Sequence, residues 1–209
     1  MILSSAIFIS LFSFLFITPT FADDDWCIAD PVNPPCSGVL GKCSRNSDGS
    51  LGGFVADTAS VVSVIVSGLG RNGPYIGLEA SVCDHARVFG AARVMGNARI
   101  SGGAWVFGSA SVFGNAWVSG SAWIFGTGQV FGSVWVFGSA QISGSASVFE
   151  NSRVFGNARV TGNAWVMGNA LVSGDSRIYE NANVFGTARV FGDALIFGNK
   201  VISEGNYAF

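Results

Sequence analysis

The sequence predicts an all-β fold, a single-stranded parallel β-helix of triangular cross-section with a small disulfide-rich cap at its N-terminal end. Three observations support this prediction. Val or Ile recurs at every sixth residue over more than half of the chain. Gly supplies 29 of the 209 residues, roughly twice the usual share. All four cysteines lie before the repeat or in its first part.

The repeat starts at Ile76 and runs without a slip to Ile202, so 22 consecutive hexads carry Val or Ile at the same place. Two residues before this aliphatic position Ala occupies 16 of the hexads, and two residues after it Gly occupies 17. A β-branched residue favours a pleated strand, the small Ala lies on the same side of that strand, and Gly followed by a polar residue favours a turn. Each hexad is therefore one short strand and one corner. Three hexads close a triangular coil of 18 residues, which gives about seven coils.

This unit, as in the hexapeptide 158–163 (Ala-Arg-Val-Thr-Gly-Asn), resembles the hexapeptide-repeat family of left-handed parallel β-helices. The resemblance covers residues 76–204 and implies a left-handed coil, although ordinary parallel crossovers are right-handed. The chain departs from the family by placing Phe or Ser directly after the aliphatic residue. Family membership also implies two chemistries, acyl transfer with a histidine base and zinc-dependent carbonic anhydrase activity. The zinc enzymes need three histidines, and this chain has only His85, so that branch is excluded.

The N-terminal segment, residues 1–22, has the features of a secretory signal peptide. An apolar run from Ala6 to Ile17 is followed by Thr20 and Ala22, which are small residues at the −3 and −1 positions of a cleavage site. An uncleaved membrane anchor is the alternative, but the run is short for a membrane span. We therefore expect a secreted protein, extracellular or, in a bacterium, periplasmic, with no transmembrane span after cleavage.

Between this segment and the repeat, residues 23–70 are expected to form a cysteine-containing cap, followed by the β-helix at 71–204 and a tail at 205–209. Residues 57–69 could be a helix N-capped by Asp57 or a buried strand, and we favour a short helix that covers the first coil. Four cysteines in a secreted chain predict two disulfides with three possible pairings, and their spacing gives no zinc motif. The cysteines are Cys27, Cys36, Cys43 and Cys83.

Stacking the hexads at intervals of 18 residues sorts the outward side chains onto three faces. Directly after its aliphatic residue, the first face carries the apolar row Met95, Phe113, Phe131, Phe149, Met167 and Phe185. The same row of the second face holds Phe89, Phe107, Phe125, Ser143, Thr161, Tyr179 and Phe197. The third face holds Ser101, Ser119, Phe137, Phe155, Ser173 and Phe191.

Two interpretations of these aromatic rows stay open. In one, the stacked rings cover one another and stiffen the coil, as in other repeat proteins. In the other, the rows are interfaces, because an apolar row of this length exceeds what a monomer usually exposes. The first face would then mediate self-association into a trimer or fibre. A tile on the second face would instead capture a glycan or an apolar surface through Trp105, Phe107, Trp123 and Phe125.

Composition limits the remaining functions. A net charge near −2 argues against a nucleic-acid partner. Acyl transfer would need His85 as a positioned general base, and the uninterrupted hexads leave no inserted loop to build a pocket. Ice binding would need flat threonine rows, but Thr161 is the only threonine in its row. We therefore expect a non-enzymatic structural or adhesive protein, without catalytic residues, metal or cofactor, that forms a homo-oligomer or fibre or binds a polysaccharide or cell surface. A hexapeptide-repeat acyltransferase and an ice-binding protein are the alternatives.

Overall fold

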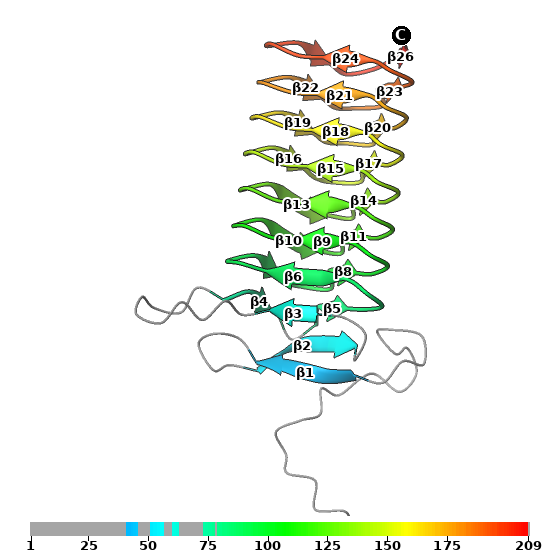
Figure 1. Cartoon of the computed structure of the whole chain (residues 1–209). Helices are drawn as coiled ribbons and strands as arrows, with labels where there is room; N and C mark the ends of the chain where they lie inside the picture. The colour runs from blue at the N-terminus through cyan, green and yellow to red at the C-terminus, as the bar shows by residue number, and fades with distance from the viewer. Residues whose placement is uncertain (1–40, 46–50, 57–59, 63–72, 78, 209) are drawn as a thin grey trace, which may run out of the picture.

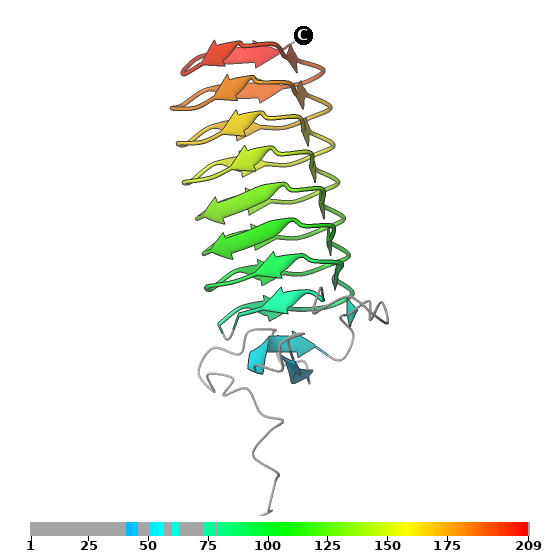
Figure 2. The same ribbon diagram turned by 90° about the vertical axis from the view of Figure 1, so that its left-hand side faces the viewer.

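A computed structural model of the chain describes residues 41–45, 51–56, 60–62, 73–77 and 79–208. These residues form an all-β parallel solenoid of about seven coils, which confirms the predicted fold class (Figure 1). The strands of the sheet nearest the viewer in Figure 1 point to the left as the chain climbs, so the coil is left-handed. Turned by 90°, the same coils stack as a straight column (Figure 2). None of the residues in these ranges forms a helix with the length and hydropathy needed to span a membrane.

Three sheets make up the sides of the prism, and each corresponds to one of the faces defined by the sequence. The first face is formed by β4 (Tyr75–Ile76), β7 (Arg93–Val94), β10 (Ser111–Gly114), β13 (Gln129–Gly132), β16 (Ser147–Val148), β19 (Trp165–Val166), β22 (Asn183–Val184) and β25 (Val201–Ile202). The second face is formed by β3 (Ser60–Val62), β6 (Arg87–Phe89), β9 (Trp105–Val106), β12 (Trp123–Ile124), β15 (Gln141–Ile142), β18 (Arg159–Val160), β21 (Arg177–Ile178) and β24 (Leu195–Ile196). The third face is formed by β1 (Gly41–Arg45), β2 (Leu51–Ala56), β5 (Ser81–Val82), β8 (Arg99–Ile100), β11 (Trp117–Val118), β14 (Trp135–Val136), β17 (Arg153–Val154), β20 (Leu171–Val172), β23 (Arg189–Phe191) and β26 (Asn206–Ala208).

The register between coils follows the hexad count. Val160, for example, pairs in parallel with Ile142 in the coil before it and with Ile178 in the coil after it. Backbone hydrogen bonds run from coil to coil along the rod, as where the amide of Thr161 donates to the carbonyl of Ile178 at 2.8 Å. Each side chain therefore lies directly above the residue 18 positions earlier, and any outward row becomes a ladder.

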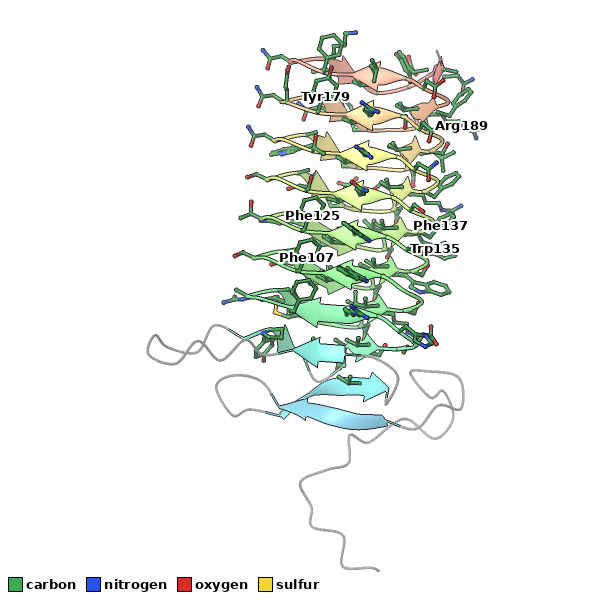
Figure 3. All side chains as sticks on the ribbon, in the orientation of Figure 1. Phe107, Phe125, Trp135, Phe137, Tyr179 and Arg189 are labelled. Atoms are coloured by element: carbon green, nitrogen blue, oxygen red, sulfur yellow. The ribbon has the colours of Figure 1, made fainter. Side chains whose placement is uncertain are left out.

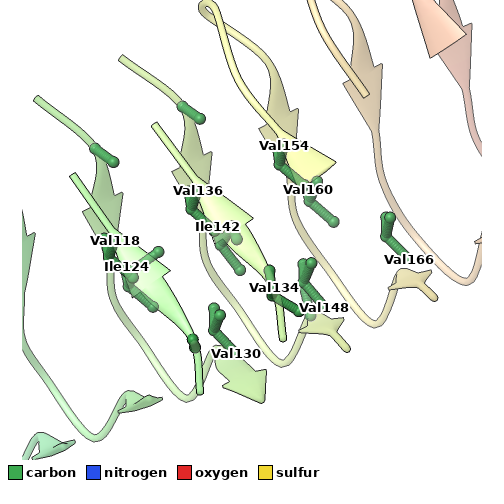
Figure 4. Close-up of a cluster of buried hydrophobic side chains, with 14 of the residues drawn as sticks. Val118, Ile124, Val130, Val134, Val136, Ile142, Val148, Val154, Val160 and Val166 are labelled. Carbon is green, nitrogen blue, oxygen red and sulfur yellow. The ribbon is translucent and has the colours of Figure 1, made fainter. Parts of the chain in front are cut away.

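Two inward columns fill the core. The aliphatic residues and the alanines two positions before them are almost all completely buried, and their side chains meet inside the prism (Figure 4). Ser152 and Ser176 replace alanine in the second column, and both are fully buried. Their hydroxyls donate to the corner carbonyls of Phe149 and Ser173 at 2.9 and 2.8 Å, so neither polar group is left unsatisfied. The predicted inward columns are confirmed.

The corners depend on glycine because their backbone lies in the left-handed region. Gly120 has a φ of 69°, and a Cβ placed there would lie 2.8 Å from the carbonyl oxygen of Gly138 in the next coil. Glycine therefore provides both the conformation and the close approach of successive coils. The polar residue that follows each glycine also forms ladders: the amide groups of Asn163, Asn181 and Asn199 are linked by hydrogen bonds of 3.1 Å.

Three acidic residues occupy this glycine position with positive φ: Asp84 at 58°, Glu150 at 63° and Glu180 at 61°. Two of them gain a compensating hydrogen bond. The amide of Gly102 donates to a carboxylate oxygen of Asp84, and the amide of Gly198 donates to one of Glu180, each at 2.8 Å. A side chain that reaches the next coil thus offsets part of the strain of the left-handed backbone.

The start of the solenoid differs from the prediction. β3 lies inside the segment expected to be a helix, so the helix is wrong for Ser60–Val62; the rest of that segment is outside the described residues. These residues pair in parallel with β6, with Val61 opposite Val88, and β-branched residues suit such pairing. Val55 likewise pairs with Val82. Both spacings are 27 residues instead of 18, so the coil begins before Ile76 but out of step with the hexad count.

The two ends of the described chain add further detail. β26 extends the third face beyond the boundary at residue 204, and the half-buried Tyr207 packs against the core in line with Val190. Cys83 is buried and disulfide-bonded. The segment predicted as a signal peptide, with Cys27 and Cys36, lies outside the described residues, and Cys43 lies in β1, so the pairing of the cysteines stays a prediction.

Candidate functional site

Most phenylalanines of the outward rows stack directly on one another. Along the second face, Phe107 lies 4.9 Å from Phe89 and 5.1 Å from Phe125, with ring planes within 4° of parallel (Figure 3). A further ring between two of them would need roughly 7 Å, twice the contact distance of carbon atoms. For these rows the geometry matches the interpretation in which the rings cover one another.

The tile proposed on the second face is occupied in the same way. Trp105 and Trp123 stack at 5.3 Å with planes 9° apart, and the edge of Phe107 packs against Trp123 at 6.3 Å. The guanidinium of Arg87 lies 5.1 Å from the centre of the Trp105 ring. The ring faces of this tile are thus turned largely toward their own neighbours, and its use as a ligand-stacking surface stays a prediction.

The first face keeps an unbroken apolar row. Its Met and Phe side chains are half-buried, and Phe131 stacks on Phe113 and Phe149 at 4.9 and 4.8 Å. Trp165 stands beside this row with 48% of its surface exposed and meets Phe149 edge to face at 6.0 Å. The row is continuous and partly accessible, which is what an association surface requires, but the association itself stays a prediction.

On the third face the aromatic side chains leave an open cleft. It has a volume of about 220 Å³ and is lined by Trp117, Ser119, Trp135 and Phe137. The ring centres of Trp117 and Trp135 are 5.5 Å apart, as in the other ladders, but their planes make an angle of 68°. Each of the two indoles is 44% exposed. Because these rings are not stacked face to face, ring surface remains open to a ligand.

The cleft exists because a small residue interrupts a ladder. Phe137 stacks on Phe155 at 4.8 Å with planes 1° apart (Figure 3 labels Phe137). One coil before Phe137 the same row carries Ser119 instead of another ring. The ring face of Phe137 on that side therefore has no aromatic neighbour and borders the cleft, so the site has the shape of a missing rung.

Polar groups are placed at both ends of the tryptophan pair. On one side the indole N–H of Trp117 donates to the hydroxyl of Ser101 at 3.1 Å, and Arg99 pairs with Trp117 in the preceding coil. On the other side the guanidinium of Arg153 lies 5.1 Å from the centre of the Trp135 ring. Four side chains in consecutive coils thus form one outward row. In chain order they are Arg99, Trp117, Trp135 and Arg153.

Charges are segregated over residues 79–208. Every arginine there lies in a strand, directly before an aliphatic residue, and is exposed: Arg87, Arg93, Arg99, Arg153, Arg159, Arg177 and Arg189. Every carboxylate lies at a corner: Glu79, Asp84, Glu150, Asp175, Glu180, Asp193 and Glu204. No ion pair joins the two sets within this part of the chain. The flat faces therefore carry positive charge although the net charge of the chain is −2.

The residues weighed for other chemistry lie apart from this cleft. His85 is exposed at a corner next to Asp84, and its backbone amide donates to the carbonyl of Gly102 at 3.0 Å. Among the residues that the structure describes, no three His, Cys, Asp or Glu side chains gather as metal ligands. Thr161 is half-buried on the second face, in a row with Ser143 and Tyr179.

Comparison with known proteins adds one match. A family model described as the YdcK beta solenoid repeat matches residues 152–168, nearly one coil that includes β17 and β18. No curated protein and no solved structure matches the chain. Together with the three parallel sheets, this match supports a β-solenoid repeat protein.

Proposed function

We propose that the protein is an exported, non-enzymatic adhesive rod of the hexapeptide-repeat type, which binds polysaccharide through the cleft on its third face. The observation that carries the proposal is the pair of 44% exposed tryptophans, Trp117 and Trp135, beside an apolar cleft. The six-residue period and left-handed coil support the family, and the apolar segment before Ala22 supports export.

The chemistry of the cleft suits a sugar ring. A pyranose has an apolar face of C–H groups, which packs against aromatic ring faces while its hydroxyls stay in water. Trp117, Trp135 and Phe137 offer such faces, and Ser119 leaves the space between them. Because the strands that carry these side chains are held on both sides by neighbouring coils, binding would cost little ordering of the protein.

The double substitution Trp117→Ala and Trp135→Ala is expected to weaken polysaccharide binding by at least about tenfold, because it removes both indole walls. The measurement is the mobility of the protein in native gels that contain soluble polysaccharides, including a neutral one. Trp165→Ala on the first face is the control, since Trp165 is equally exposed but lines no part of this cleft. An unretarded wild type in every gel, or equal losses for control and double variant, would contradict the proposal.

Self-association through the first face is the second candidate function, favoured by the unbroken row from Met95 to Phe185. Replacing Phe131 and Phe149 by Ser is expected to shift the protein from oligomer to monomer without unfolding it, because the inward columns are untouched. Sedimentation at several concentrations measures this shift.

The matched control for that experiment is the replacement of Phe107 and Phe125 by Ser, which breaks an equivalent stack on the second face. The control should leave the association of the protein unchanged. A wild type that stays monomeric at high micromolar concentration would leave the first-face row as self-stacked surface only.

The two alternatives from the sequence make separate predictions. An acyltransferase would bind acyl-CoA and lose activity on His85→Ala, and an ice-binding protein would show thermal hysteresis. Neither has a supporting observation in the described residues.

A further inference from the structure

The geometry points to an acidic polysaccharide as the ligand of the third-face cleft, with its anionic groups held by Arg99 and Arg153. This inference rests on the proposed function, because it names the class of glycan for the same cleft. It goes further in assigning a role to the charges at the two ends of the tryptophan pair.

The arginines are in register with the cleft. Arg99 is the parallel partner of Trp117, and Arg153 is the parallel partner of Trp135. With a rise of about 4.8 Å per coil, the row from Arg99 to Arg153 spans roughly 14 Å along the rod. A short stretch of glycan that places one sugar in the cleft therefore brings the acidic groups of neighbouring sugars within reach of both guanidinium groups.

The charge at this face is uncompensated. Arg99 and Arg153 are exposed and form no ion pair within residues 79–208, and the carboxylates of that region are confined to the corners. The guanidinium of Arg153 is packed against the Trp135 ring, which limits its conformations. Its N–H groups remain suited to the paired oxygens of a carboxylate or a sulfate. An uncharged glycan would leave both cations without a partner.

Single-stranded nucleic acid is the other polymer that combines stacking with negative charge. The structure favours the polysaccharide because the third face lacks a continuous basic groove. Its strand positions carry Arg99, Arg153 and Arg189, and the last of these is two coils beyond Arg153. The net charge of −2 and the predicted export of the chain point in the same direction.

The test uses two pairs of polymers that differ mainly in charge: polygalacturonate with its methyl ester, and carboxymethyl cellulose with hydroxyethyl cellulose. Native-gel mobility in each polymer gives a dissociation constant for the full-length protein. We expect the wild type to bind the acidic member of a pair about tenfold more tightly at low salt, and to lose this preference as sodium chloride is added.

The variant R99Q/R153Q should bind the acidic polymer no more tightly than the neutral one. Two controls accompany it. R99K/R153K keeps both charges and should retain most of the preference, and R159Q/R177Q removes two exposed arginines from the second face and should behave like the wild type. Circular dichroism confirms that each variant keeps the β-solenoid.

The outcomes separate this inference from the proposed function. Equal, tryptophan-dependent binding of acidic and neutral polymers would overturn the inference and leave the proposed function standing. Absence of binding to all four polymers would overturn both. Binding of single-stranded DNA as tight as that of polygalacturonate, or equal losses in R99Q/R153Q and R159Q/R177Q, would show unspecific attraction of polyanions and overturn the inference.

Discussion

Val160→Asp is expected to unfold the coils around β18 and to cost more than about 4 kcal/mol of stability. Val160 is completely buried between Ile142 and Ile178, so a carboxylate there would have no water and no partner. Because coils of a solenoid contact only their neighbours, amide hydrogen exchange should show the loss of protection first in the adjacent coils. Far-UV circular dichroism measures the loss of β-structure.

Arg159→Asp is the matched control, since Arg159 precedes Val160 in the same strand and is exposed. It introduces the same carboxylate on the outer side, beside Arg177 of the next coil, and should leave the fold intact. Equal loss of β-structure in the two variants would show that the inward and outward positions have been assigned wrongly.

Gly120→Ala is expected to lower the free energy of unfolding by about 1–3 kcal/mol, the usual cost of a strained backbone position. Gly120 has a φ of 69°, and the added methyl group would meet the backbone nitrogen and oxygen of Gly138 at 2.9 and 2.8 Å. Unlike Asp84 or Glu180 at the equivalent corners, alanine cannot repay this cost with a hydrogen bond to the next coil. Urea unfolding measures the difference.

Ser121→Ala serves as the control, because Ser121 is the exposed corner residue that follows Gly120. It should change stability by less than about 0.5 kcal/mol, as surface substitutions usually do. Similar losses for the two alanine variants would mean that the close approach of the coils at Gly120 is not what limits this corner.

The hexad count predicts most of this fold because the period is strict. From Ile76 to Ile202 one residue type marks every strand, so coil size, register and inward columns follow directly. The count fails where spacing changes. Val61 pairs with Val88 across 27 residues, and Tyr207 lines up with Val190 across 17, so neither strand falls in the series. A local pattern of Val and Ser could not distinguish a capping helix from one more strand.

The cleft could not be predicted in the same way, because ring orientation decides it. Stacking by 18 residues places Trp105 under Trp123 and Trp117 under Trp135 at nearly equal distances, yet the first pair is parallel and the second is tilted by 68°. Orientation depends on neighbours: Phe107 packs against Trp123, whereas Ser119 leaves space beside Trp117. The detectable signal was a serine below a phenylalanine next to two successive tryptophans.

The direction of the backbone hydrogen bonds has a mechanical consequence. They join coil to coil, so a force applied along the rod pulls on them end to end instead of shearing them. Coils would then detach one at a time from an end, and each would release 18 residues, or about 60 Å of extended chain. Since a coil depends only on its neighbours, the coils that remain stay folded. A tethered protein of this kind would yield in steps under tension while its remaining coils keep their shape.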